Sequence, residues 1–213
     1  MANLLTEPAP PLVLASASPR RLELLERIGL TFDVVESVAE PDGPRDADPC
    51  AHAGQSALAK ALDVAAQRPD ALVLGADTLV WIDGHPLGKP ADERQAADML
   101  RALRGRTHTV HTGVALVGPG GPQGPAEVVC VDTVVRFRSL TDDTIRRYVA
   151  TGEPLDKAGA YGIQGRGAVL VESIRGCYYN VVGLPLPKVA EMLERRGVCC
   201  LAKSGTGPIP GVP

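Results

Sequence analysis

The sequence lacks the features that mark several large classes of protein. Its 213 residues carry a net charge of −3, so the basic surface typical of sequence-independent nucleic-acid binding is missing and we expect no nucleic-acid partner. The longest apolar run, residues 71–82, is interrupted by Asp77 and is too short to span a bilayer. The first residues have neither the basic segment nor the apolar core of a signal peptide. We therefore expect no membrane association and a cytoplasmic location.

Cysteines and familiar nucleotide-binding fingerprints are also scarce. The five cysteines are irregularly spaced, which argues against a disulfide framework and against a zinc site. His108 and His111 lie three residues apart in an expected strand, so their side chains point to opposite faces and make a poor metal pair. The glycines fit neither a dinucleotide-binding fingerprint nor a Walker A sequence. The cysteines, histidines and glycines therefore match no short motif that would identify a ligand.

What is present suits a globular α/β protein. The chain is 45% hydrophobic and 22% charged, which is enough to bury one core or two small lobes that share a cleft. We expect a flexible N-terminus over residues 1–10, a single catalytic domain over 11–197 and a flexible C-terminal tail over 198–213. The patterns predict strands over residues 31–37, 71–82, 107–117, 128–138 and 169–173, and helices over 56–67, 91–103, 141–150 and 187–196.

The stretch from Leu12 to Arg21 has the pattern of a strand, a tight loop and a helix. An apolar run opens it, and Ser18 and Pro19 suit the N-cap and the first helical turn. Such a junction directs free backbone N–H groups and the helix dipole at one point. Arg20 and Arg21 in the first turn are unfavourable for the helix alone, and they are explained if an anion such as a phosphate chain binds there. The alternative is a capped helix with two solvated arginines.

A second informative stretch ends in Asp77 and Thr78. The apolar residues 71–76 read as a strand buried on both faces, and in open α/β sheets ligands bind beyond the carboxyl ends of such strands. Asp77 therefore stands where catalytic groups are common, although a helix cap or turn aspartate is the simpler alternative. A hairpin turn at Asp83 and Gly84 should follow.

A third stretch, residues 156–165, is rich in glycine and permits close backbone approach to a ligand. Carboxylates and cations at the ends of expected elements are what metal-assisted phosphoryl chemistry needs. Each member also has a simpler reading, since Lys60 can be a solvated helix residue and Lys89 a loop lysine. The candidate set is Arg20, Arg21, Glu40, Lys60, Asp77, Lys89, Asp156 and Lys157.

Six ordered segments carry a family resemblance. They are residues 16–21 (SASPRR), 75–78 (GADT), 87–90 (LGKP), 105–108 (GRTH), 112–115 (TGVA) and 152–159 (GEPLDKAG). Together they resemble the Maf-like nucleotide pyrophosphatases over about residues 12–196. The resemblance implies a two-lobed α/β fold in which helices flank an elongated mixed β-sheet around a central cleft. It also implies a divalent-metal-dependent hydrolase, with Mg²⁺ or Mn²⁺, that cleaves nucleoside triphosphates between the α- and β-phosphates. Members are commonly cytoplasmic homodimers.

Carried over by position, the resemblance assigns roles to single residues. Asp77 matches the proton acceptor and a metal ligand, Glu40 a metal-site carboxylate, and Lys60 and Lys89 the phosphate-binding lysines. Residues matched to substrate binding are Ser16, Ser18, Arg20, Arg21, Thr78, Asp156, Lys157 and Gln164. The family often has Asp before the acid at position 40, where this chain has Ala39, so Glu36 is the alternative to Glu40.

Residues 161–164 (YGIQ) resemble the branch of the family that acts on dTTP and UTP. A sister branch that acts on 7-methyl-GTP tends to carry Glu at the position of Gln164. The leading hypothesis is therefore a dTTP/UTP pyrophosphatase that cleans the nucleotide pool. Two alternatives stay open, namely the same chemistry on modified pyrimidine nucleotides and a nucleotide-binding regulator of septum formation.

Overall fold

The computed structural model describes residues 10–40 and 48–201. The terminal segments expected to be flexible therefore lie largely outside the described residues, as do residues 41–47 of the acidic loop. Among the residues that the structure describes, no helix is both long and apolar enough to cross a membrane.

A seven-stranded mixed sheet forms the centre of the molecule. Its strand order is β2-β1-β3-β5-β6-β7, and the short β4 pairs with β3. The β1 strand is parallel to β2 and β3, while the other pairs are antiparallel. The strands span Leu12–Ala15 (β1), Asp33–Val34 (β2), Leu72–Ile82 (β3), His85–Leu87 (β4), Thr107–Val117 (β5), Ala126–Phe137 (β6) and Val171–Arg175 (β7). The expected mixed α/β sheet is confirmed.

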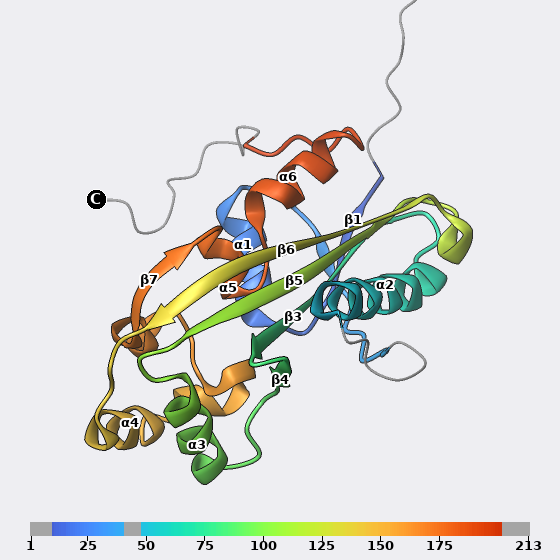
Figure 1. Cartoon of the computed structure of the whole chain (residues 1–213). Helices are drawn as coiled ribbons and strands as arrows, with labels where there is room; N and C mark the ends of the chain where they lie inside the picture. The colour runs from blue at the N-terminus through green and yellow to red at the C-terminus, as the bar shows by residue number, and fades with distance from the viewer. Residues whose placement is uncertain (1–9, 41–47, 202–213) are drawn as a thin grey trace, which may run out of the picture.

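Helices cover both faces of this sheet (Figure 1). One long helix, α2, packs on one face, while α1, α5 and α6 lie on the other. The helices α3 and α4 pack against each other at one end of the sheet. The helix bounds are Pro19–Arg27 (α1), Pro49–Gln67 (α2), Glu93–Leu103 (α3), Asp142–Val149 (α4), Tyr178–Val182 (α5) and Leu186–Glu194 (α6).

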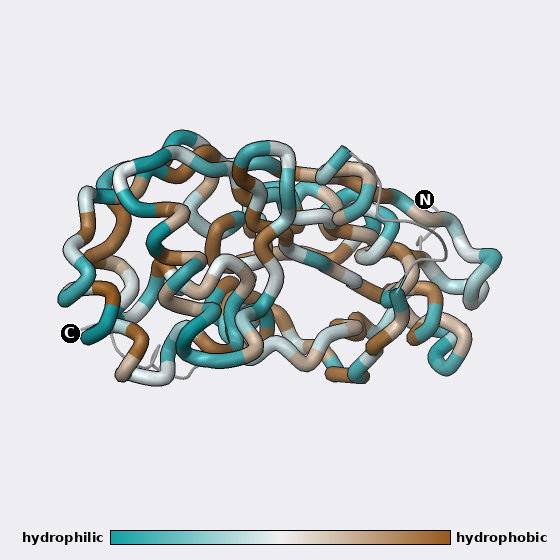
Figure 2. The backbone as a smooth tube through the Cα atoms, turned by 60° about the horizontal axis from the view of Figure 1, so that its bottom comes forward, coloured by the Kyte–Doolittle hydropathy of each residue, from teal (hydrophilic) through white to brown (hydrophobic). Residues whose placement is uncertain are grey.

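The hydrophobic core likewise forms two clusters of buried residues, one on each face of the sheet. Alternating residues of β1 illustrate this, because Leu12 and Leu14 belong to the larger cluster while Val13 and Ala15 join the cluster beneath α2. The hydropathy colouring of the backbone shows hydrophobic segments through the middle of an elongated body (Figure 2). Burial on both faces explains why β1 and β3 read as continuous apolar runs.

Close approach of α2 to the sheet depends on two glycines. A Cβ added at Gly75 of β3 would lie 2.3 Å from the carbonyl oxygen of Ala57. One added at Gly113 of β5 would lie 2.1 Å from the carbonyl oxygen of Ala53. Neither position has room for a side chain, so α2 sits directly on the backbone of the two strands.

One expectation about cysteine is wrong. Cys50 in the first turn of α2 forms a disulfide with Cys130 of β6, across 80 residues of sequence. Irregular spacing could not reveal the pair, because only the packing of α2 over β6 brings the two residues together, with Cα atoms 5.5 Å apart. Among the described cysteines, Cys177, Cys199 and Cys200 are free.

Candidate active site

A cavity of about 360 Å³ opens between the β1–α1 junction and the glycine-rich segment. The carboxyl end of β1 leads into it from one side, and the middle of β3 forms part of its wall. Its lining includes Ser16, Ser18, Arg20, Arg21, Lys60, Asp77, Thr78, Lys89, Asp156, Lys157 and Gln164. Residues from five separate stretches of the sequence thus meet in one place, whereas Glu40 and Glu36 are exposed and do not line the cavity.

An ion pair between Lys60 and Asp77 lies in the wall of this cavity. The Lys60 ammonium is 2.6 Å from Oδ1 of Asp77, and the two side chains are only 13% and 20% exposed. Lys60 projects from α2, which reaches β3 closely because of Gly75. A short charge-assisted hydrogen bond of this kind fixes the orientation of the carboxylate. Lys60 is therefore no freely solvated helix residue.

Arg21 holds three parts of the chain together. Its guanidinium donates to the backbone carbonyl oxygen of Gly183 at 2.9 Å, to Oγ of Ser16 at 3.2 Å and to Oγ1 of Thr78 at 3.1 Å. Thr78 in turn contacts Oγ1 of Thr112 at 3.0 Å. Burial lowers the pKa of Arg21, while the charge of Asp77 opposes that shift. Several N–H groups of Arg21 are thus already hydrogen-bonded within the protein. Arg21 therefore stabilises the β1–α1 junction in addition to placing a positive charge at the cavity.

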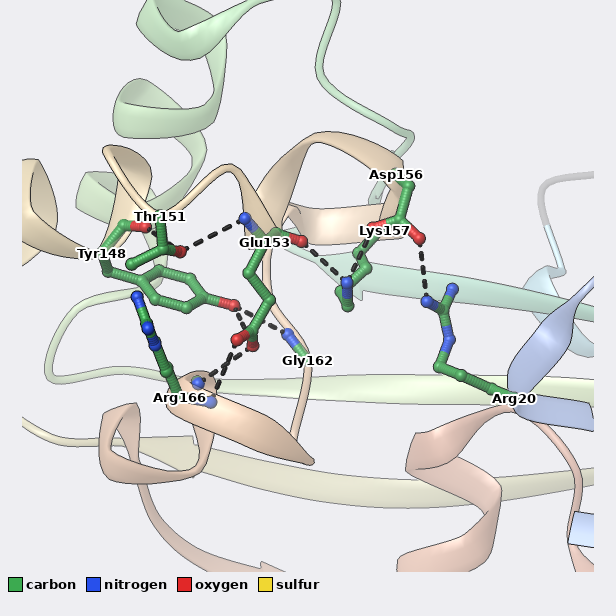
Figure 3. A network of polar contacts seen from close by, with 9 residues as sticks. Arg20, Tyr148, Thr151, Glu153, Asp156, Lys157, Gly162 and Arg166 are labelled. Atoms are coloured by element: carbon green, nitrogen blue, oxygen red, sulfur yellow. Dashed lines mark hydrogen bonds and ion pairs between the residues drawn. The ribbon is translucent and has the colours of Figure 1, made fainter. Parts of the chain in front are cut away.

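Arg20 reaches the glycine-rich side of the cavity, where it contacts Asp156 (Figure 3). Its guanidinium lies 3.0 Å from Oδ2 of Asp156, and the Lys157 ammonium lies 2.6 Å from Oδ1 of the same residue. Burial alone would raise the pKa of Asp156, but hydrogen bonds from Lys157 and Arg20 outweigh it and hold that pKa below its ordinary value. Since Asp156 is exposed, an incoming anion could take over both cations.

Glu153 anchors the loop that carries Gln164, and sequence reasoning assigned it no role. Its carboxylate accepts hydrogen bonds from the Tyr148 hydroxyl at 2.9 Å and from the backbone N–H groups of Arg166 and Gly167 at 3.0 Å each (Figure 3). Tyr148 also accepts from the N–H of Gly162 at 3.1 Å. The signal in the sequence was the position of Glu153 in the segment 152–159, but its partners are created only by the fold.

Tyr161 of the same loop also lines the cavity. Its hydroxyl lies 2.8 Å from Nε2 of the buried His108, and the ring meets that of Phe137 edge to face. Burial lowers the pKa of His108 to about 4 and raises that of Tyr161. His108 is thus a core histidine, and it supports the cavity wall through Tyr161.

The donor set of the cavity fits a hard divalent cation shared with a substrate. Within residues 10–40 and 48–201, no three His, Cys, Asp or Glu side chains converge on the cavity, so a cage built from protein alone is not formed there. Mg²⁺, however, is commonly held by one or two carboxylates together with substrate phosphates and water. Asp77 offers such a carboxylate, with Lys60 bonded to one oxygen. The role of Glu40 stays a prediction.

Comparison with known proteins identifies relatives along most of the chain. The dTTP/UTP pyrophosphatase of Moorella thermoacetica is 59% identical over 187 residues, covering 88% of this chain and 95% of the relative. Proteins of the same name from Symbiobacterium thermophilum and Pelotomaculum thermopropionicum are 51% and 48% identical, each over 87% of this chain and over 94% and 96% of their own.

Solved structures offer a weaker comparison. A HAM1 protein from Coxiella burnetii aligns over 70% of this chain and 85% of its own, with a TM-score of 0.42 and 18% identity, which is too low to support an argument. The profile of the family described as Maf-like protein, by contrast, matches residues 11–196. With that match and relatives of up to 59% identity, the chain belongs to the Maf-like protein family.

Proposed function

We propose that this protein hydrolyses dTTP and UTP to the monophosphate and pyrophosphate, and so removes these nucleotides from the pool. The observation that carries the proposal is the Lys60–Asp77 pair, which lies in a cavity rich in cations. The names of the relatives, dTTP/UTP pyrophosphatase, support the substrate class.

The cations suit a triphosphate chain. Lys89 is exposed at the cavity and makes no hydrogen bond or ion pair with any other described residue. Arg20 and Lys157 are paired through Asp156 across the opening. A triphosphate that enters would exchange these contacts for bonds to its own oxygens, which charged donors bind strongly. Ser16 and Ser18 add polar groups at the start of α1, where the helix dipole favours an anion.

Asp77 is the proposed general base. Lys60 holds Oδ1, so the remaining oxygen can accept the proton of a water molecule as its oxygen bonds to the α-phosphorus. The bond from the α-phosphorus to the bridging oxygen breaks, and pyrophosphate departs with that oxygen. Neighbouring cations stabilise the charge that develops on the leaving group. Asp77 and Glu40 are the proposed ligands of a bound Mg²⁺ or Mn²⁺, which would neutralise phosphate charge further.

Gln164 is the proposed reader of the base. Uracil and thymine present an N–H donor between two carbonyl acceptors, and one glutamine amide can pair with a donor and an acceptor together. Gln164 lines the cavity from the loop that Glu153 anchors. Thr78 belongs to the same lining.

The wider setting is proposed from the family resemblance. We infer a cytoplasmic homodimer that uses Mg²⁺ or Mn²⁺ and needs neither nucleic acid nor a membrane. Two alternatives remain candidates, namely the same reaction on modified pyrimidine nucleotides and a nucleotide-binding role in septum formation. A regulator that only binds would have no need of the Lys60–Asp77 pair as a catalytic unit.

Product analysis tests the reaction. With Mg²⁺ the purified protein should convert UTP to UMP and pyrophosphate, and EDTA should stop it. Asp77→Asn should fold normally and lower kcat by roughly 10²–10⁴, the range for a positioned general base. Asp70→Asn is the matched control, since Asp70 is 71% exposed and lies outside the cavity lining. UDP as the product, or full activity of Asp77→Asn, would refute the proposal.

A nucleotide panel tests the base assignment. Gln164→Glu should lower kcat/KM for UTP and dTTP by about 10–100-fold, because a carboxylate only accepts hydrogen bonds and would face a base carbonyl. Gln67→Glu, at the exposed end of α2, makes the same change away from the cavity. An equal loss on UTP, CTP and GTP would mean that Gln164 supports the loop and does not select the base.

A further inference from the structure

Three metal-ligating side chains converge outside the candidate active site. Cys50 comes from the first turn of α2, His111 from β5 and Cys130 from β6. Their ligand atoms all lie within 4.8 Å of one another, and all three residues are partly buried. None of them lines the catalytic cavity, so the cluster has no place in the proposed hydrolysis.

The position of His111 distinguishes this cluster from a plain disulfide. Its Nδ1 lies 3.6 Å from Sγ of Cys50, and no other hydrogen bond joins its ring to the described residues. A tetrahedral zinc ion with bonds of about 2.3 Å to sulfur and 2.0–2.1 Å to nitrogen separates neighbouring ligand atoms by roughly 3.6 Å. The imidazole nitrogen therefore already stands at ligand spacing from one sulfur.

The sheet register holds these groups on one face. His111 lies opposite Asp132 in the β5–β6 ladder, and Cys130, two residues before Asp132, points to the same side. Cys130 lies opposite Gly113, the glycine on which α2 rests. Because α2 sits so close to the sheet there, its first turn brings Cys50 down onto β6.

Two carboxylates stand next to these ligands in the chain or in the ladder. Asp132 is exposed and forms no ion pair within the described part of the chain. Asp48 caps α2 by accepting from the N–H of Cys50 at 2.9 Å. Neither carboxylate belongs to the group of converging ligand atoms, so a water molecule is the fourth ligand we expect, as is common in Cys₂His sites.

We propose that Cys50, Cys130 and His111 form a second metal site, for a soft divalent ion such as Zn²⁺, that is occupied when the Cys50–Cys130 disulfide is reduced. A dithiol reductant supplies two electrons and two protons to the disulfide and itself becomes a disulfide. The metal then replaces the two thiol protons, which pass to solvent. Oxidised and metal-bound forms exclude each other, so the pair is either a covalent link or a metal clip between α2 and β6.

Thiolate and imidazole ligands select the class of metal. Sulfur ligands favour zinc and other soft ions over Mg²⁺, for which the catalytic cavity offers the oxygens of Asp77 and of a bound substrate. Cys130 and Asp77 both lie opposite Gly113 in its two neighbouring strands. The backbones of Asp77 and Cys130 are thus two strand spacings apart, roughly 10 Å. The catalytic cavity and the cysteine cluster can therefore be tested independently.

A metal titration without nucleotide tests the proposal. The full-length protein is reduced with a phosphine, which is then removed under nitrogen, and Co²⁺ and Zn²⁺ are added. Reduced protein should bind one Co²⁺ with the absorption of thiolate coordination, and Zn²⁺ should displace it. Protein whose Cys50–Cys130 disulfide is intact should bind at least about 100-fold more weakly, because it lacks both thiolates.

Variants identify the ligands. Cys50→Ser, Cys130→Ser and His111→Gln should each weaken Zn²⁺ binding at least about 10-fold, and the serine variants should lose the thiolate absorption in proportion. Reduced wild type also lacks the disulfide, so it controls for folding of the serine variants by circular dichroism. Cys177→Ser and His85→Gln, at a free cysteine and an exposed histidine, should bind as wild type does. The proposal is overturned if reduced wild type binds no stoichiometric metal, or if the control and cluster variants behave alike.

Discussion

Replacing Glu153 by Gln tests whether the loop of Gln164 depends on a carboxylate. The two side chains have the same shape, but the amide has one acceptor oxygen where Glu153 has two. If that oxygen keeps the contacts with the Tyr148 hydroxyl and the N–H of Gly167, the new NH₂ group faces the N–H of Arg166, now 3.0 Å from Oε2. The charge-assisted hydrogen bond from the N–H of Arg166 is then lost, and two hydrogen-bond donors face each other.

The magnitude follows from those contacts. A hydrogen bond to a charged group contributes about 1.5–3 kcal/mol, and an unpaired backbone donor adds a desolvation cost. Glu153 is only partly exposed, so solvent screens little of this, and we expect a loss of about 2 kcal/mol. For a domain of this size that lowers Tm by roughly 4–8 °C. Because the loop positions Gln164, kcat/KM for UTP should fall about 10–100-fold.

Thermal unfolding, amide hydrogen exchange and UTP kinetics are the measurements. In Glu153→Gln, amide hydrogen exchange should accelerate more at residues 162–167 than in β5. Glu172→Gln is the matched control, because Glu172 is 51% exposed and pairs with Arg136 at the surface, where such pairs contribute about 0–1 kcal/mol. If Glu153→Gln and Glu172→Gln give the same Tm and the same kcat/KM, the carboxylate does not hold this loop.

Three further predictions concern the catalytic wall, the helix seat and the aromatic cluster. Lys60→Met leaves the Asp77 carboxylate without its 2.6 Å partner, and kcat/KM for UTP should fall by about 10²-fold or more in steady-state assays. Gly113→Ala pushes a methyl group to 2.1 Å from the carbonyl oxygen of Ala53, and urea unfolding should show a loss of at least about 2 kcal/mol. His108 has a folded-state pKa lowered to about 4 from 6.5, so the folded protein binds fewer protons than the unfolded chain between these pH values. That stabilisation, about 3 kcal/mol, is present above pH 6.5 and is lost as the pH falls through 4, and His108→Gln should flatten the urea-unfolding profile over this window.

Matched controls exist for each of these variants. Lys188→Met removes a half-exposed lysine of α6 that lies outside the cavity lining and pairs with Glu191, and it should leave kcat/KM unchanged. Gly88→Ala adds a methyl group where nothing lies within 4 Å. His85→Gln alters an exposed histidine of β4 and should leave the acid slope of stability in place. Control effects as large as those of the test variants would contradict the reasoning in each case.

The long strands and amphipathic helices were predictable because local pattern and burial agree there. The expected strand over residues 107–117 matches β5, and that over 71–82 begins one residue before β3. The expected strand over 31–37 is reduced to β2, Asp33–Val34, since this segment pairs only along the sheet edge. The helix expected from residue 56 begins at Pro49 because Asp48 caps it, although residues 49–55 show little helical periodicity. Five-residue α5 is too short to leave a periodic signal.

The residue types of the candidate site were predictable from the sequence, but the hydrogen bonds that hold its loop in place were not. Charged residues at the ends of expected elements pointed to Asp77, Arg20 and Lys60, and the family resemblance added Gln164; all four line one cavity. The expectation that Asp77 follows the carboxyl end of its strand was wrong, because β3 runs on to Ile82 and Asp77 lies in its middle. The contacts of Glu153 with Arg166 and Gly167 could not be predicted, because they depend on how an irregular loop folds back.

One helix supports both the candidate active site and the cysteine cluster, and its packing explains how the two coexist. Lys60 lies ten residues beyond Cys50 in α2, which is roughly 15 Å along the helix axis. Between them, Ala57 rests on the backbone of Gly75 with no room for a Cβ. That contact lies three residues from Lys60, much nearer along α2 than the disulfide at Cys50. Rearrangement at the first turn of α2 can therefore accompany a change from disulfide to metal clip while the Lys60–Asp77 pair stays in place.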